Sequence, residues 1–202
     1  MTPSLSSPPP LIHPIWVRLM HWSNALAFLV LLTSGWRIYN ASPFLPLHIP
    51  ADVTLGGWLG GALLWHFAAM WLLVVNGLLY LTVGLAGGRL RERLWPIRLP
   101  LLWQDLVDAL RGRLNHVDLR HYNQVQRAAY VFAVLDIVVL VMSGLVLWKS
   151  VQFPLLRTLL GGYETARRVH FAGMAGGFGF LCVHVLMTLR FPQTLRAMLL
   201  GR

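Results

Sequence analysis

Four long apolar runs constrain what this chain can fold into. They cover residues 15–39, 55–85, 128–148 and 169–189, and each reaches the length of about 20 apolar residues that a bilayer-spanning helix needs. The second and fourth runs contain no Asp, Glu, Lys or Arg, and Asp136 is the one formal charge of the third. Because backbone groups in lipid must be hydrogen-bonded internally, the runs predict helices rather than strands. The chain is therefore predicted to be an all-α integral membrane four-helix bundle.

The remaining segments are expected to be tails and connections. We expect a disordered tail over 1–12, a membrane domain over 13–190 and a second tail over 191–202. The longest connection, 89–127, is polar and rich in Arg, and within it 102–114 predicts an amphipathic helix on the membrane surface between the second and third spans. No soluble domain and no internal repeat are expected. Only 12% of the residues are charged, against about 25% in soluble domains, which agrees with this division.

The basic residues indicate how the bundle is oriented. The formal net charge is +10, and twelve of the 17 Lys and Arg residues fall on the side of the membrane that holds both termini. The positive-inside rule therefore predicts that both termini are cytoplasmic. Since the arginines flank the apolar runs, we assign the excess charge to membrane orientation and expect no nucleic-acid partner.

Four of the eight histidines lie inside the apolar runs, namely His21, His66, His170 and His184. Ionisable residues at membrane depth are costly and usually face the interior of the bundle, with a partner. His170 and His184 are 14 residues apart in the fourth run, which puts both on nearly the same face of one helix. Their separation along that helix is about 21 Å, so they can serve two sites at different depths.

The predicted depths pair these histidines across the bundle. His21 and His184 both lie near the cytoplasmic ends of their helices, while His66 and His170 both lie in the outer half. A haem iron accepts one imidazole from each side of its plane, and two filled axial positions suit the iron to electron transfer. The sequence therefore predicts two b-type haems, each held by one histidine of the fourth helix and one of an earlier helix. For any single histidine, the alternative is a polar residue that ties two helices together.

Arginines and glycines beside these histidines have two possible roles each. Arg18 lies one turn before His21, and Arg167 and Arg168 adjoin His170, so all three are candidates to bind haem propionates. The alternative for each arginine is anchoring at the membrane interface. The glycines between the two histidines of the fourth run allow the close approach of a flat ring or of another helix.

Several motifs resemble those of the prokaryotic diheme cytochrome b561 superfamily. They are the segment Arg18-Leu-Met-His21-Trp22, the four histidine positions, and the segment 121–127, which reads His-Tyr-Asn-Gln-Val-Gln-Arg. The resemblance covers about 15–189 and looks closest to the membrane subunits of formate dehydrogenase, thiosulfate reductase and NiFe-hydrogenase. The connection over 89–127 is long and Arg-rich for this superfamily, so the residues of its quinone site do not transfer directly.

The resemblance implies a function as well as a fold. It implies that His21 and His184 bind a cytoplasmic haem, and that His66 and His170 bind a periplasmic one. It also implies a bacterial inner-membrane location, a quinone substrate near the cytoplasmic haem, and a periplasmic partner, often a molybdopterin enzyme. The catalytic chemistry would then reside in that partner.

Two other interpretations stay open from the sequence. The chain could be a stand-alone cytochrome b561 that oxidises a small donor such as superoxide and reduces quinone. It could instead be a haem-free transporter that uses its membrane histidines for metal ions or protons. Asp136, in the middle of the third run, is expected to be either a hydrogen-bonded structural residue or part of a proton path to a quinone site.

Overall fold

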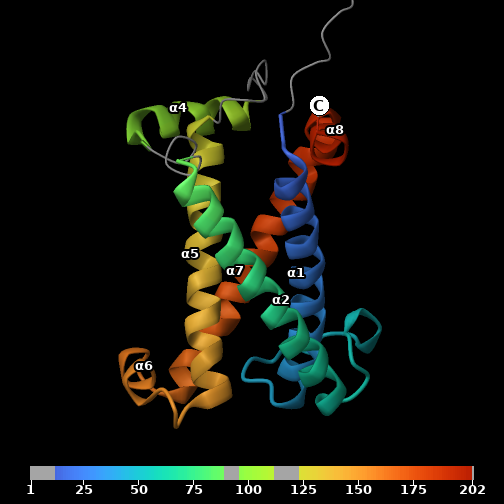
Figure 1. Ribbon diagram of the computed structural model, residues 1–202. Coiled ribbons are helices and arrows are strands. Elements are labelled where there is room, and N and C mark those ends of the chain that lie inside the picture. Colours follow the sequence, from blue (N-terminus) through green and yellow to red (C-terminus); the bar gives the residue numbers. More distant parts are fainter. Residues whose placement is uncertain (1–11, 89–95, 112–122, 202) are drawn as a thin grey trace, which may run out of the picture.

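Four long helices form the body of the molecule. The computed structural model describes residues 12–88, 96–111 and 123–201, and in these residues it contains helices but no strand. The long helices are α1 (Ile15–Ala41), α2 (Leu59–Ala86), α5 (Gln124–Lys149) and α7 (Tyr163–Arg190), and each is long and apolar enough to cross a membrane (Figure 1). The predicted all-helical architecture with four spans is confirmed.

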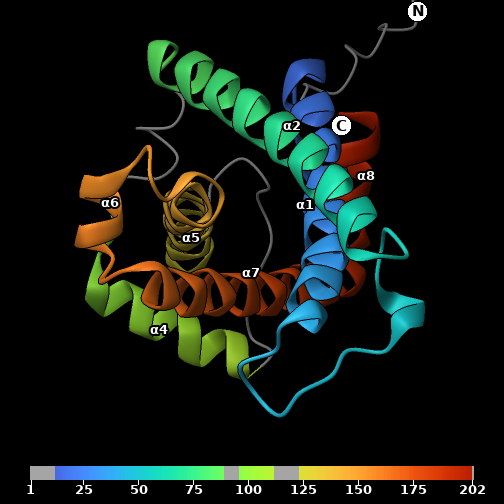
Figure 2. The same cartoon turned by 90° about the horizontal axis from the view of Figure 1, so that it is seen from below.

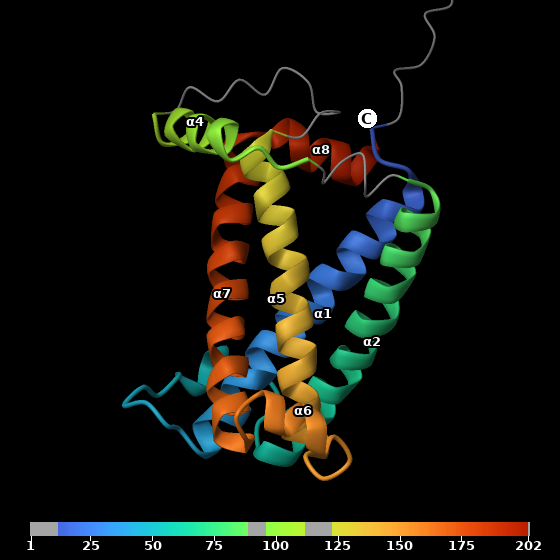
Figure 3. The same ribbon diagram turned by 90° about the vertical axis from the view of Figure 1, so that its left-hand side faces the viewer.

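Short helices lie at the two ends of the bundle. They are η1 (Ala51–Val53), α4 (Leu99–Leu110), α6 (Pro154–Leu159) and α8 (Pro192–Leu200). Helices α4 and α8 lie across the end at which α1 begins, and α6 lies at the opposite end (Figures 1 and 3). The surface helix predicted over 102–114 corresponds to α4, which begins three residues earlier, while residues 112–114 fall outside the described part. Its location on the membrane surface stays a prediction.

The start of α5 is fixed by side chains that bond to its free backbone groups. The side chain of Asn123 accepts a hydrogen bond from the backbone N–H of Gln126 at 2.8 Å, and the Gln126 side chain accepts one from the Asn123 N–H at 3.1 Å. This reciprocal pair satisfies two N–H groups that a helix start leaves open. Asp105 of α4 accepts a third bond, from the N–H of Gln124 at 2.7 Å, which ties the two helices together.

An internal repeat relates the first pair of long helices to the second. The sequence Val30-Leu31-x-x-Ser34-Gly35 in α1 recurs as Val139-Leu140-x-x-Ser143-Gly144 in α5, and His66-Phe67-Ala68-x-Met70 in α2 recurs as His170-Phe171-Ala172-x-Met174 in α7. Counterparts are 109 residues apart in α1 and α5 but 104 apart in α2 and α7. The expectation of no internal repeat was therefore wrong.

The packing of the helices follows this repeat. Helix α1 packs along α2 and α5 packs along α7, and the two pairs cross around a common centre (Figure 2). Two sets of counterparts in the helix contacts are equally buried: Ala62 and Ala166 are both 0% exposed, as are Ser34 and Ser143. The chain thus has an approximate two-fold arrangement whose halves are two helix pairs.

Candidate functional site: two histidine pairs

The first histidine pair joins α1 to α7. The ring centres of His21 and His184 are 6.0 Å apart, at the end of the bundle that carries α4 and α8. Aromatic rings support both imidazoles: Trp22 meets His21 edge-on at 5.3 Å, and Phe180 stacks on His184 at 5.8 Å. The pair predicted from the two depths is therefore brought together in the structure.

The second pair joins α2 to α7 at the opposite end of the bundle. The ring centres of His66 and His170 are 6.4 Å apart. The aromatic contacts on the two sides of this pair are counterparts in the repeat. Tyr39 meets Phe171 at 4.9 Å on one side, and Trp148 meets Phe67 at 5.3 Å on the other. The second pair thus lies close to the centre of the two-fold arrangement, whereas the first lies to one side.

The spacing of both pairs fits one metal ion between two imidazoles. A metal–nitrogen bond of about 2.0 Å, with each ring centre about 1.1 Å further on, separates the ring centres by about 6.2 Å. The measured separations of 6.0 and 6.4 Å lie on either side of this value. Each pair offers two ligands and no third, and no group of three or more metal-binding side chains occurs in the described residues. A four-ligand ion such as structural zinc is therefore a poor fit, while a haem iron, which takes four ligands from its own ring, fits well.

Hydrogen bonds orient the His170 imidazole for this role. Its Nδ1 lies 3.1 Å from the carbonyl oxygen of Leu140 and 3.0 Å from the hydroxyl of Ser143. A carbonyl oxygen only accepts, so Nδ1 carries the hydrogen and Nε2 keeps its lone pair for a metal. Ser143 in turn donates to the carbonyl of Val139 at 2.6 Å, which leaves its oxygen free to accept from the imidazole.

His66 is held by the counterpart residue in the first half. Its Nδ1 lies 3.1 Å from the hydroxyl of Ser34, which itself donates to the carbonyl of Val30 at 2.5 Å. Gly35 and Gly144 follow the two serines, and a methyl group on either would come within 3.4 Å of an imidazole carbon. Sequence reasoning missed both serines and both glycines. The repeated Ser-Gly step, placed in each half against a His-Phe-Ala segment, was the signal that identifies them.

Three of the four glycines between His170 and His184, namely Gly173, Gly176 and Gly177, serve to pack helices. A methyl group on Gly173 would come within 3.0 Å of Leu140, and one on Gly177 would come within 3.0 Å of Phe28 and of Asp136 Oδ2. The close approach that these glycines allow is therefore made by side chains of α1 and α5. Asp136 consequently sits against α7 at a depth between the two histidine pairs.

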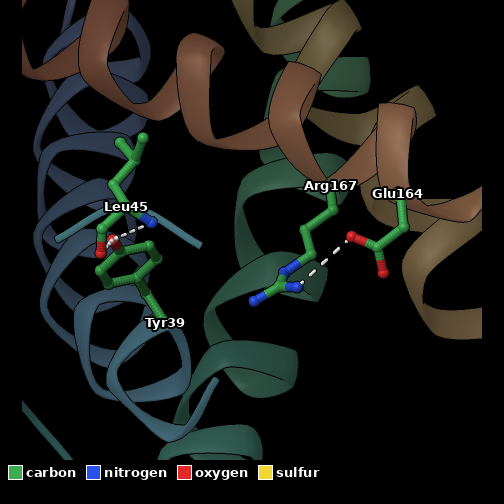
Figure 4. A network of polar contacts seen from close by, with 4 residues as sticks. All are labelled: Tyr39, Leu45, Glu164 and Arg167. Atoms are coloured by element: carbon green, nitrogen blue, oxygen red, sulfur yellow. Dashed lines mark hydrogen bonds and ion pairs between the residues drawn. The ribbon is translucent and has the colours of Figure 1, made fainter. Parts of the chain in front are cut away.

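The three candidate arginines have different surroundings. Arg18 donates through Nε to the carbonyl of Met198 at 3.3 Å and through Nη2 to the carbonyl of Leu199, so it anchors the end of α8. Arg167 lies 3.5 Å from Glu164 and over the ring of Phe44, and Figure 4 shows it near the loop that Tyr39 binds. Arg168 is exposed next to His170. Binding of propionates by these arginines stays a prediction, and Arg18 still has N–H donors beyond the two used here.

The loop between α1 and α2 is fastened to the end of α1. The hydroxyl of Tyr39 donates to the carbonyl of Leu45 at 3.2 Å and accepts from its N–H at 3.3 Å (Figure 4). Asn40 exchanges two hydrogen bonds with the backbone of Ile49, at 2.7 and 3.1 Å. These bonds give the end of the bundle beyond the His66 and His170 pair a defined surface.

Comparison with known proteins places these features in a family context. Residues 12–201 match the family model described as prokaryotic cytochrome b561. The chain is 60% identical to a putative protein-methionine-sulfoxide reductase subunit YedZ1 of Azospira oryzae, over 94% of this chain and 96% of that protein. It is 27% identical to a probable Ni/Fe-hydrogenase B-type cytochrome subunit of Cupriavidus necator, over 86% of this chain and 76% of that protein. No solved structure matches the chain.

Proposed function

The chain belongs to the prokaryotic cytochrome b561 family, and from this premise we propose that it is a diheme subunit that carries electrons from quinol to a periplasmic sulfoxide reductase. Its general role as a multi-pass membrane electron-transfer subunit follows from the family and the four candidate spans. The proposal of two haems is supported by the two pairs of imidazoles from different helices, whose ring centres are 6.0 and 6.4 Å apart.

The proposal gives each histidine a defined task. His21 and His184 would hold one haem, and His66 and His170 the other. A haem bound at each pair supplies a one-electron redox centre. Ser34 and Ser143 keep two of the imidazoles in the tautomer whose Nε2 can bind metal. A haem held by two imidazoles would supply electron transfer rather than oxygen chemistry.

The partner and the direction of flow are inferred from the more similar relative. That protein is named as a putative protein-methionine-sulfoxide reductase subunit, and it aligns over nearly the whole of both chains. Reduction of a sulfoxide to a thioether takes two electrons and two protons and releases water, and oxidation of one quinol to quinone supplies both. We therefore place quinol as the donor and a sulfoxide-reducing subunit, of molybdopterin or similar type, as the acceptor.

The orientation in the proposal follows the positive-inside rule. The end with α4 and α8 would face the cytoplasm of a bacterial inner membrane, and the end with His66, His170 and α6 would face the periplasm. The partner would then dock over the fastened loop between α1 and α2 and over α6. In α6, Leu155 and Leu159 are 72% and 73% exposed, which gives this end an apolar contact surface.

Spectroscopy and redox titration test the proposal directly. The purified protein should show a b-type band in the reduced-minus-oxidised spectrum and two components in the titration. His66→Ala and His21→Ala should each remove a different component, while His48→Ala, an exposed loop position, should remove neither. A protein that purifies without haem, or His66 and His21 variants that keep both components, would contradict the proposed pairing. Co-purification of a periplasmic subunit that reduces a sulfoxide tests the partner.

A further inference from the structure

Each histidine pair takes one ligand from each half of the internal repeat. The first half consists of α1 and α2 and supplies His21 and His66, while the second half is built on α5 and α7 and supplies His170 and His184 from α7. A metal ion bound between the rings of either pair would therefore join the two halves of the molecule. Both of the proposed haem sites thus lie on the interface between the halves.

The helices within each half pack closely on each other. Helix α1 packs along α2, and α5 packs along α7 (Figure 2). Each half also orients a histidine by its own contacts. Ser34 of α1 lies 3.1 Å from Nδ1 of His66 in α2, and Ser143 of α5 lies 3.0 Å from Nδ1 of His170 in α7. One ligand of this pair is therefore held in place within the first half, and the other within the second.

The contacts between the halves are looser. Among the described residues, the backbones of α1 and α2 come close to those of α5 and α7 at isolated positions only. Many of the side chains that meet across the interface are aromatic, as where Trp36 contacts Phe178 at 5.6 Å and Trp71 contacts Trp148 at 6.2 Å. Apolar side chains gain little by leaving lipid, so helices in a membrane associate through close packing and polar contacts. The interface between the halves is poor in both.

Polar contacts between the halves are concentrated at one end. Arg18 of α1 donates to the carbonyls of Met198 and Leu199 in α8, and the N–H of Ile12 bonds to the carbonyl of Gly201 at 2.8 Å. A single hydrogen bond contributes about 1 kcal/mol. These bonds fasten the end of the chain to the start of α1, but they do not reach the level of His66 and His170.

We propose that the two halves are separately packed units and that the cofactors bound at the histidine pairs hold them together as one bundle. Each half carries two imidazoles, and the closed bundle is the state in which each imidazole shares a metal with one from the other half. The binding free energy of a metal group held by two units is also the free energy that associates them. This inference rests on the proposed function, which supplies haem at both pairs. It adds that the association of the halves depends on cofactor binding.

Cleavage of the chain between the halves tests this dependence. A sequence for a site-specific protease is inserted in the connection between α2 and α4, and a tag after Arg202 retains the second half in detergent. With haem bound, the first half should stay with the second. After transfer of the haem to apomyoglobin, the retained fraction of the first half should fall by about tenfold or more. The double variant His21→Ala/His66→Ala should show the same loss, and His48→Ala should show none.

A cut inside the first half is the matched control. The same protease sequence inserted after His48 separates α1 from α2, and these two helices pack closely. The α1 fragment should therefore stay with the tagged remainder whether or not haem is bound. Equal release of both fragments on haem removal would show that haem stabilises all helix contacts alike. That result would overturn the proposal, as would full retention of the first half without haem.

Distances in the uncleaved chain provide a second measurement. Spin labels are placed on α2 and α5 through Leu79→Cys and Leu135→Cys, at positions that are 49% and 59% exposed, with Cys182→Ser to remove the native thiol. The distance distribution should be narrow with haem bound and broad in His21→Ala/His66→Ala. Labels within the first half, at Leu79→Cys and the 63% exposed position of Leu19→Cys, should stay narrow in both.

The outcomes separate this inference from the proposed function. A narrow distribution between α2 and α5 in the haem-free variant would overturn the inference and leave the proposed function standing. A purified chain that binds no haem would overturn the proposed function and the inference together.

Discussion

Ser34 and Ser143 occupy positions where small changes should act on the proposed haem site. Each hydroxyl lies within 3.1 Å of a histidine Nδ1 and donates its own hydrogen to a backbone carbonyl one turn earlier. Groups that accept from the second nitrogen of a ligating histidine fix the ring orientation and raise its basicity. The serines are thus positioning residues for the pair of His66 and His170.

Replacement of Ser34 should loosen the haem that we propose for that pair. Ser34→Ala is expected to lower haem affinity by about 10-fold or more, since changes to such partners cost about 10- to 100-fold in metal affinity. Ser143→Ala should have a comparable effect, because a backbone carbonyl still accepts from the imidazole in both halves: that of Leu140 for His170 and that of Leu31 for His66. Haem retention during dialysis against apomyoglobin measures the affinity. Thr33→Ala is the control, since the Thr33 hydroxyl bonds carbonyls of its own helix. Equal haem loss in Thr33→Ala and Ser34→Ala would contradict the assigned role.

Asp136 should influence both of the proposed redox centres from its place between the two histidine pairs. Its carboxyl lies against Gly173, Gly176 and Gly177, between the levels of the two histidine pairs. An ionised carboxyl favours the oxidised form of a nearby haem, so Asp136→Asn should raise both midpoint potentials by roughly tens of mV. Redox titration measures the shift, and Asp52→Asn, in the loop before α2, is the control. Unchanged potentials would show that Asp136 is neutral and structural.

The four histidines were predictable because polar rings at membrane depth need partners, and sequence spacing gives their depths. The serines were not, because a Ser in an apolar helix ordinarily bonds its own backbone, as Ser34 and Ser143 also do. Their contact with a histidine of another helix depends on how the two helices cross, and the sequence around a serine does not contain this information. Arg18 shows the same limit, since its bonds to α8 join residues about 180 positions apart.

Among the helices, the spans were predictable and their junctions were not. Hydropathy alone defined the ends of α1, α2 and α5 to within four residues, whereas α7 begins six residues before the predicted run. Helix α8 was expected to be part of a tail, yet residues 192–200 are helical and bind Arg18. The segment 121–127 was singled out by resemblance, and its described part forms the capped start of α5.

The capping box of α5 should contribute measurably to stability. Asn123→Ala removes the acceptor for the N–H of Gln126 and is expected to cost about 1 kcal/mol. The midpoint of thermal unfolding in detergent should fall, and protease cleavage in the connection before α5 should rise. Gln152→Ala, an exposed position after the end of α5, serves as the control. An unchanged midpoint would mean that the bond of Asp105 to Gln124 suffices to hold the helix start.

The docking of α8 should depend on Arg18. A cation near the end of a helix stabilises its free carbonyls, and here the guanidinium donates directly to two of them. Arg18→Ala should therefore release α8 and speed trypsin cleavage after Arg196, while Arg18→Lys should have an intermediate effect. Arg157→Ala in α6, at the other end of the bundle, is the control. Cleavage of Arg18→Ala at the unchanged rate would show that apolar packing alone holds α8.

Within the described residues the molecule has four candidate spans, and an even number of spans puts both ends of the membrane domain on one side. The distribution of Lys and Arg predicts that this side is the cytoplasm. Green fluorescent protein fused after Arg202 should then fluoresce, and alkaline phosphatase inserted after Gln152 should be active. The reverse pattern would invert the proposed orientation in the membrane while leaving the histidine pairs intact.

The two-fold arrangement escaped prediction for a simple reason. Counterparts are 109 residues apart in one helix pair and 104 in the other, so no single shift aligns the two halves of the sequence. Equivalent positions of the repeat also differ in chemistry: Asp136 corresponds to Ala27, and Phe180 corresponds to Asn76. Only the residues around His66 and His170, which meet near the centre, still show the relation clearly.

That relation also suggests how such a protein could begin. A single two-helix ancestor that paired with its own copy would bring one histidine from each copy to the symmetry axis, and one cofactor would have sufficed for the dimer. A histidine pair away from the symmetry axis would have occurred twice in such a dimer, and both copies would have lain at the same end of the bundle, where space is limited. Joining the two copies in one gene would have removed that constraint, because each copy could then have changed separately. On this view the central cofactor is the older one, and transfer across the full thickness of the membrane became possible only after gene fusion.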